Sequence, residues 1–294
     1  YILRYGSRVV IGASMHSSQE KWSIRLPQSR DELVSVQLLR GLAAFMVMFT
    51  HAQAETVQKF GAISYRRIDV PGSVGVDIFF VISGFIMVYA SQGLFGQAGA
   101  ATAFMKRRVI RIVPLYWFYT TAMIAATQLF ADRLNSAAFE PYNAIMSYLF
   151  IPAMAPKGEI APILDLGWTL NYEMFFYVVF ACAIGLPIRR AVIAVIVAIC
   201  LIAAVGFAFP MPFDVLTFWT NSIIIEFVLG CALGYYYIQW GRRENTPAFL
   251  LALTAGLAWY YLGYYGYLTG DRFFDRGISA ALLVYGFVFH MPSW

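Results

Sequence analysis

Long apolar runs, each of about twenty residues, recur along the chain and are separated by shorter polar segments. A helical run of that length matches the hydrocarbon thickness of a bilayer, so each run predicts one membrane-spanning helix. Eight runs meet this description, at about residues 33–52, 73–91, 109–131, 166–186, 190–209, 214–238, 247–268 and 275–291. The pattern predicts an all-α polytopic membrane protein whose membrane domain covers residues 33–291, with no separate soluble domain.

The composition agrees with a membrane protein. Of the 294 residues, 60% are hydrophobic, 17% are aromatic and only 13% are charged. Soluble globular proteins carry about 25% charged residues, and aromatic residues gather at membrane interfaces. The net charge of +5 fits basic cytoplasmic loops better than a nucleic-acid-binding surface. We therefore expect contact with membrane lipids and no nucleic acid partner.

The distribution of Lys and Arg predicts a cytoplasmic N-terminus. With that orientation, 13 of the 21 basic residues lie in cytoplasmic segments and seven lie on the opposite side, as the positive-inside rule requires. Residues 1–32 hold five of these cations without the apolar core or cleavage site of a signal peptide, so they predict a basic cytoplasmic tail. The chain starts at Tyr1 and stops just after an apolar run, and we expect truncation at both ends.

The first apolar run carries two polar residues, Arg40 in its interior and His51 at its far end. A cation at membrane depth costs at least about 2.5 kcal/mol, so it is usually retained for pairing or function. Eleven positions make about three helical turns, which places both side chains on nearly one face, about 16 Å apart. Taken alone, His51 is more typical of an interfacial residue. Arg40 fits equally well as a counter-ion to Glu173 or Glu226.

Two carboxylates lie near the same predicted depth as His51. Asp77 lies near the outer end of the second run, and Glu173 lies a turn or two inside the fourth. A histidine beside a carboxylate in a dry site is a plausible general base. The alternative for Asp77 is a helix cap. Glu226 has no motif partner, which favours a structural pairing.

Basic and aromatic clusters predict two binding regions. Arg108 and Arg111 share a helix face beside Arg107, and Arg suits the bidentate binding of phosphate groups. The alternative is an anchor for anionic lipid. Trp168, Tyr172 and Tyr177 flank Glu173 and suit a sugar ring, although such residues are also common in interfacial belts.

The cysteines offer no metal or redox chemistry. Cys182, Cys200 and Cys231 lie inside apolar runs, without the spacing of a disulfide framework or zinc site. No Ser or Cys lies in a recognisable nucleophile motif. The sequence thus predicts no metal site and requires no covalent acyl-enzyme.

Four stretches resemble the acyltransferase 3 family of integral membrane acyltransferases, and within it the exopolysaccharide-production acetyltransferases. They are LRGLAAFMVMFTH at 39–51, GVDIFFVISGF at 75–85, RRVIRIVPLYW at 107–117 and GWTLNYEMFFY at 167–177. The resemblance covers about residues 33–290. It implies a helical fold of usually about ten spans, whereas this chain ends after the eighth predicted one.

The resemblance also implies a function. The family transfers an acyl group, commonly acetyl, from cytoplasmic acyl-CoA to a glycan hydroxyl at the outer face of the bacterial inner membrane. Arg40 and His51 match its signature pair, Arg108 and Arg111 its cytoplasmic arginines, and Glu173 its Trp-x4-Glu acid. The implied partners are acyl-CoA, a glycan or lipid-linked oligosaccharide acceptor, and a polysaccharide assembly machinery.

The residues and the resemblance together give the following roles. His51, Arg40, Glu173 and Asp77 are the expected catalytic group. The residues expected to hold the acyl-CoA are Arg107, Arg108, Arg111, Ser83 and Gly84, and those expected to contact the acceptor are Trp168 and Tyr172. A transporter or flippase that moves a glycan or acyl donor without chemistry is the alternative function. A structural subunit of an assembly complex is a third reading.

Overall fold

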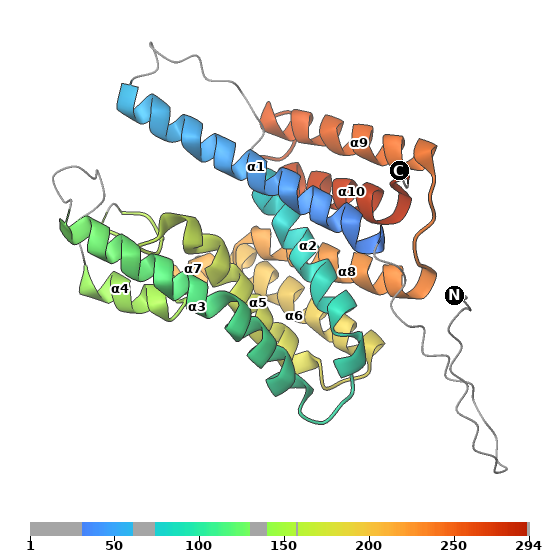
Figure 1. Cartoon of the computed structure of the whole chain (residues 1–294), viewed down its shortest axis with the longest axis horizontal. Coiled ribbons are helices and arrows are strands. Elements are labelled where there is room, and N and C mark those ends of the chain that lie inside the picture. The colour runs from blue at the N-terminus through green and yellow to red at the C-terminus, as the bar shows by residue number, and fades with distance from the viewer. Residues whose placement is uncertain (1–30, 61–73, 130–139, 157, 293–294) are drawn as a thin grey trace, which may run out of the picture.

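The structure is a computed structural model that describes residues 31–60, 74–129, 140–156 and 158–292 (Figure 1). In this part of the chain every element is helical and no strand occurs, which confirms the all-α class. The longer helices are α1 (Asp31–Phe60), α2 (Val74–Ala90), α3 (Ala100–Leu129), α5 (Trp168–Ala183), α6 (Ile188–Ala208), α8 (Ile225–Trp240) and α9 (Thr246–Tyr264). The shorter ones are α4 (Pro141–Tyr148), α7 (Asp214–Trp219) and α10 (Ile278–Tyr285), with short turns η1 (Gln92–Leu94), η2 (Asp165–Gly167), η3 (Ser222–Ile224), η4 (Phe273–Gly277) and η5 (Gly286–His290).

Each of the eight predicted runs coincides with helical structure, but their lengths differ. Five helical segments are long and apolar enough to cross a membrane, and they fall in α1, α3, α6, η3 with α8, and α9. Helix α2 has 17 residues and α5 has 16. The eighth run is a continuous helix over residues 273–290, in which the π-helical turns η4 and η5 flank α10. The structure therefore describes a multi-pass membrane protein without fixing the number of spans.

Two differences between the helices and the predicted runs have local reasons. Helix α3 starts at Ala100 instead of residue 109, because the preceding Ala, Met, Lys and Arg residues are strong helix formers. The run at 214–238 is interrupted between α7 and η3, where the Asn221 side chain accepts a hydrogen bond from the backbone N–H of Ile223 at 3.1 Å. This capping interaction starts a new helix.

Helices α2 and α8 form the centre of the molecule (Figure 1). Their backbones approach closely because glycines face each other across the contact. A side-chain carbon at Gly84 would overlap the carbonyl of Phe227, and one at Gly230 would overlap the carbonyl of Val81. The small-xxx-small spacing of Gly230 and Gly234 thus marks a packing face.

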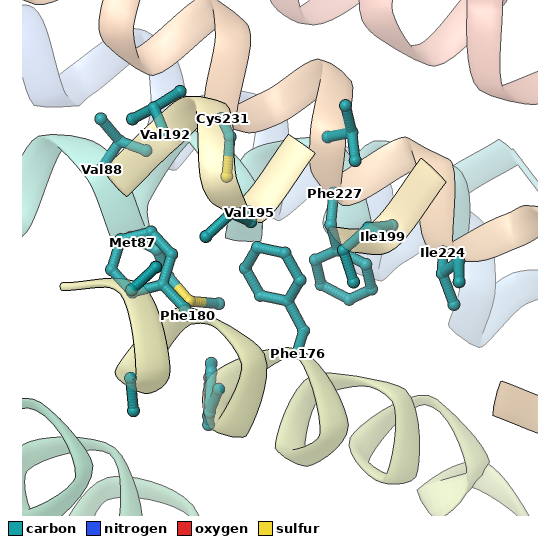
Figure 2. Close-up of a cluster of buried hydrophobic side chains, with 14 of the residues drawn as sticks. Met87, Val88, Phe176, Phe180, Val192, Val195, Ile199, Ile224, Phe227 and Cys231 are labelled. Carbon is teal, nitrogen blue, oxygen red and sulfur yellow. The ribbon is translucent and has the colours of Figure 1, made fainter. Parts of the chain in front are cut away.

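Two apolar cores lie on either side of this central pair. One contains side chains from α2, α3, α5, α6 and α8, including Phe176 stacked on Phe227 with ring centroids 4.4 Å apart (Figure 2). The other joins α2 and α8 to α1, α9 and α10. Large apolar side chains on the periphery, such as Phe118, Leu201 and Leu251, are exposed, as expected for helices that face lipid.

Candidate active site

A cavity of about 220 Å³ lies between α1, α2, α3 and α5. Six of its lining residues are polar or charged, namely Arg40, Ser83, Arg108, Arg111, Glu173 and Tyr177. The rest are apolar, namely Phe79, Ile82, Ile86, Met87, Ile112 and Leu170. The cavity collects five of the predicted site residues from four separate segments of the chain. Tyr177, one of the aromatic residues that flank Glu173 in the sequence, also lines the cavity.

Three arginines make the cavity cationic. Arg40 comes from α1, whereas Arg108 and Arg111 come from one face of α3. The Arg108 guanidinium carbon lies 5.3 Å from the ring centroid of Phe104 and 5.7 Å from that of Tyr177. Its Nε is buried and has no hydrogen-bond partner. Such a donor is rare in a folded protein and marks a position where a ligand oxygen gains a hydrogen bond.

Glu173 is the acid of the cavity, and neighbouring hydroxyls fix both of its carboxylate oxygens. Ser83 of α2 donates a hydrogen bond to Oε1 over 2.5 Å. Tyr177, one turn further along α5, donates a hydrogen bond to Oε2 over 3.0 Å. Within the described residues no ion pair joins Glu173 to Arg40. The carboxylate is therefore held at the cavity wall, with the arginines of α1 and α3 around the same space.

His51 lies apart from the cavity. The start of α2 packs against α1 near Ala43 and Val47. Gly75 lies so close to both residues that an added side-chain carbon would overlap them. His51 lies four residues beyond Val47, or about 6 Å further along α1. Its side chain is exposed and does not line the cavity. Among the described residues, no ion pair joins His51 to Glu173 or Asp77.

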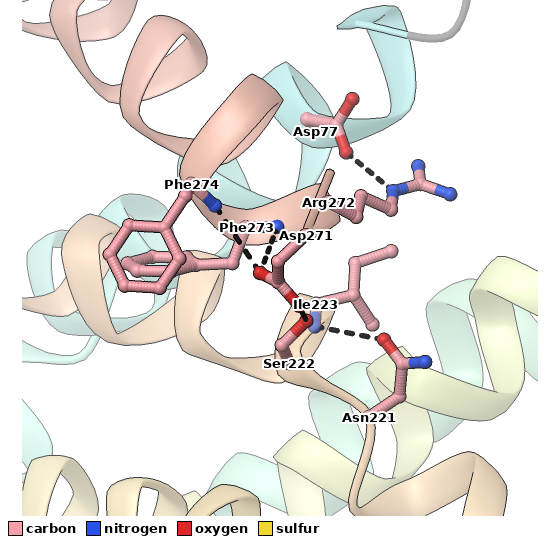
Figure 3. A network of polar contacts seen from close by, with 8 residues as sticks. All are labelled: Asp77, Asn221, Ser222, Ile223, Asp271, Arg272, Phe273 and Phe274. Carbon is pink, nitrogen blue, oxygen red and sulfur yellow. Dashed lines mark hydrogen bonds and ion pairs between the residues drawn. The ribbon is translucent and has the colours of Figure 1, made fainter. Parts of the chain in front are cut away.

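Asp77 belongs to a second polar cluster at the start of α2. The side chain of Asp77 is fully buried, and its Oδ1 accepts a hydrogen bond from Arg272 Nε at 2.9 Å (Figure 3). The Arg272 guanidinium lies over the ring of Trp168, 5.5 Å from its centroid. The sequence analysis missed Arg272 because 195 residues separate it from Asp77 and no motif surrounds it.

The remaining predicted residues serve packing or lie on the surface. Gly84 faces the backbone of α8 and not the cavity. Tyr172 is buried, with Phe218 stacked on it at a centroid distance of 3.9 Å. Arg107 is exposed and does not line the cavity. Among the described residues, no group of three or more His, Cys, Asp and Glu is arranged to hold a metal ion.

Comparison with known families decides the class of the protein. Residues 33–294 match the family model described as "Acyltransferase domain", which is the acyltransferase 3 family. This match covers every helix that lines the cavity. The chain belongs to the acyltransferase 3 family. The resemblance inferred from the four sequence stretches is thereby confirmed.

Three curated proteins are similar in sequence to the chain. The exopolysaccharide production protein ExoZ of Rhizobium meliloti (strain 1021) is 37% identical over 171 residues, covering 57% of this chain and 52% of the relative. Acyltransferase MdmB of Streptomyces mycarofaciens is 26% identical over 258 residues, covering 80% and 64%. The putative membrane-bound transacylase BcsY of Komagataeibacter xylinus is 27% identical over 162 residues, covering 52% and 37%.

The matched regions therefore span between 37% and 64% of the length of these relatives, which is less than two thirds in each case. No solved structure matches the chain significantly.

Proposed function

We propose that the chain is a membrane-embedded O-acyltransferase that moves an acyl group, acetyl foremost, from acyl-CoA to a hydroxyl of an exported or cell-surface polysaccharide. The observation that carries this proposal is the cavity, where three arginines and a fixed carboxylate converge from three helices. Family membership supplies the reaction class. The name of one relative, an exopolysaccharide production protein, supports a glycan acceptor, and that of another, a putative membrane-bound transacylase, supports acyl transfer at a membrane.

The proposed donor site uses the arginines of the cavity. Phosphate groups of CoA pair with Arg108 and Arg111 by charge-assisted hydrogen bonds, and the unpartnered Arg108 Nε supplies one donor. Arg107 adds positive charge from the surface beside them. Ligand pockets usually measure about 300–1,000 Å³. The cavity of about 220 Å³ is smaller, so it accommodates a part of CoA and the rest extends beyond it.

The proposed chemistry takes place further along α1. Arg40 lines the cavity, and His51 lies about 16 Å further along the same helix. The pantetheine arm of CoA runs outward from the phosphates toward His51. There the imidazole removes the proton from the acceptor hydroxyl while the hydroxyl oxygen attacks the thioester carbonyl. The carbon–sulfur bond breaks, and the CoA thiolate takes the proton from the imidazolium.

The acids and aromatic residues have supporting roles in this scheme. Glu173 and Asp77 act as positioning residues, Glu173 beside the donor arginines and Asp77 through Arg272. Ser83 fixes Glu173, and Gly84 allows α2 and α8 to approach. Trp168, beside Arg272, contributes to the acceptor side, and the buried Tyr172 supports it from the core. The scheme assigns the N-terminus to the cytoplasm and the chain to the bacterial inner membrane, next to a polysaccharide assembly machinery.

Transfer of label from radiolabelled acetyl-CoA to envelope polysaccharide tests the proposal. Membranes hold equal amounts of the native chain, His51→Ala or His290→Gln. His290 is the matched control because it binds Tyr285 and the carbonyl of Arg243, away from the cavity. We expect transfer by the native chain and by His290→Gln, and a loss of more than about 100-fold with His51→Ala. Equal transfer by His51→Ala would remove His51 from the chemistry. Binding of acetyl-CoA without any transfer would favour the transporter alternative.

A further inference from the structure

The second polar cluster, which contains Asp77 and Arg272, also includes a fully buried carboxyl group, that of Glu226. Glu226 is in the first turn of α8, and its side chain packs beside Gly277, where an added carbon would meet it. Neither of its carboxylate oxygens has a hydrogen-bond partner, and neither does Oδ2 of Asp77. Gly230 of α8 faces the carbonyl of Val81 of α2, and Glu226 and Asp77 each lie four residues, or about one turn, before them, so the two acids lie at the same level of the α2–α8 contact. Three buried acid oxygens therefore lie together without a donor.

Two ionised carboxylates in this arrangement are unfavourable. Each loses hydration, and their like charges repel in a medium of low polarity. The other charged or titratable groups near Glu226 are Arg272, Arg276 and Tyr172. Arg272 directs its Nε to Asp77, and among the described residues neither Arg276 nor Tyr172 donates a hydrogen bond to Glu226. A single proton between the two acids satisfies Asp77 Oδ2 and removes one charge.

We propose that Glu226 is protonated and donates its hydrogen to Asp77 Oδ2, so that the acid pair carries one negative charge. Asp77 then accepts from Glu226 on one oxygen and from Arg272 on the other. The resulting chain of hydrogen bonds links α8, α2 and the segment before η4. It fixes the Arg272 guanidinium over Trp168. Glu226 is a positioning residue that acts through Asp77 and Arg272.

Two substitutions of Glu226 separate this proposal from a role as a charged group. Glu226→Gln keeps a neutral donor for Asp77, whereas Glu226→Met keeps similar volume without a donor. In the purified full chain in detergent, we expect Glu226→Gln to melt within about 2 °C of the native chain. We expect Glu226→Met to melt about 5 °C lower, because it leaves Asp77 Oδ2 buried and unpaired. An equal decrease in melting temperature in Glu226→Gln and Glu226→Met would overturn the proposal.

Infrared spectroscopy reads the proton directly and does not depend on acyl transfer. The native chain should show a carbonyl stretching band of a buried protonated carboxyl, which Glu226→Gln abolishes and the control Glu159→Gln retains. Glu159 is the matched control because it is an exposed acid. A native spectrum without this band, or a band that survives in Glu226→Gln, would overturn the proposal. So would a band that appears only in Arg276→Gln, because Arg276 would then be the counter-ion of an ionised Glu226.

Discussion

The carboxylate of Glu173 illustrates what the sequence could predict at the scale of single residues. Its motif predicted a functional acid, and the structure places it with Ser83, Arg40, Arg108 and Arg111 around one cavity. The expected depth of a residue follows from its position in an apolar run, but its direction around the helix axis does not. For that reason the convergence of His51 and Asp77 on Glu173 stays a prediction, and the pairing of Asp77 with Arg272 was missed.

The contribution of Arg108 to donor binding is the first prediction at this scale. Arg108→Gln removes a guanidinium whose buried Nε is unpartnered. Hydrogen bonds to charged groups contribute about 1.5–3 kcal/mol, so the KM for acetyl-CoA should rise about 10- to 100-fold. Arg107→Gln is the matched control, since Arg107 is exposed and does not line the cavity. An equal rise in both variants would show that only the summed charge matters.

The Ser83–Glu173 hydrogen bond gives a second prediction. If Ser83 acts by fixing Glu173, the effects of Ser83→Ala and Glu173→Gln on kcat/KM should not add. We expect a coupling of about 1 kcal/mol, or about fivefold, from a double-mutant cycle. Ser83→Ala combined with Arg107→Gln should be additive, because these residues share no contact in the described structure. Additive effects of Ser83→Ala and Glu173→Gln would contradict a positioning role for Ser83.

At the scale of helices, the sequence predicted the position of nearly every element. Apolar periodicity and length located the runs, and the spacing of Gly230 and Gly234 indicated a close contact. The sequence pattern did not reveal that α8 packs against α2, because Gly84 and Phe227 are far apart in the chain and meet only after folding. It also missed the break between α7 and η3, which depends on the capping by Asn221.

The glycine contact between α2 and α8 predicts an asymmetry between two Gly→Ala substitutions. At Gly230 the added carbon overlaps the carbonyl of Val81, whereas at Gly41 in α1 nothing lies within 4 Å. Gly230→Ala should therefore force the central helices apart and destabilise the protein by about 1–3 kcal/mol. Gly41→Ala should be neutral or stabilising, because Ala favours a helix. Thermal unfolding in detergent compares the two, and equal melting temperatures would refute the close contact.

For the whole molecule, the all-α membrane architecture followed from composition and run length alone. The number of spans did not, because α2 and α5 are shorter than the runs that predicted them, and five helical segments of the described chain are long and apolar enough to cross a membrane. Orientation rests on the distribution of Lys and Arg. Such counting describes how a chain inserts, but it carries no information about which helices pack together.

The predicted orientation has a direct test with two matched substitutions. Glu159→Cys lies between α4 and α5, on the predicted outer side, and Glu244→Cys lies between α8 and α9, on the predicted cytoplasmic side. Both glutamates are exposed. In cells that carry the chain with its three native cysteines replaced, a membrane-impermeant maleimide should label Glu159→Cys in intact spheroplasts and Glu244→Cys only after lysis. The reverse pattern would invert the topology.

The central claim is that an acyl group passes from CoA, bound among Arg40, Arg108 and Arg111, to a glycan on the other side of the membrane. The most direct measurement is the sidedness of transfer in sealed vesicles loaded with the acceptor polysaccharide. Radiolabelled acetyl-CoA is supplied outside to inside-out or right-side-out vesicles. We expect labelled polysaccharide only within inside-out vesicles, where the cytoplasmic face meets the donor, and about tenfold or more less label with Arg108→Gln. Transfer in right-side-out vesicles alone, or equal transfer by Arg108→Gln, would contradict the account.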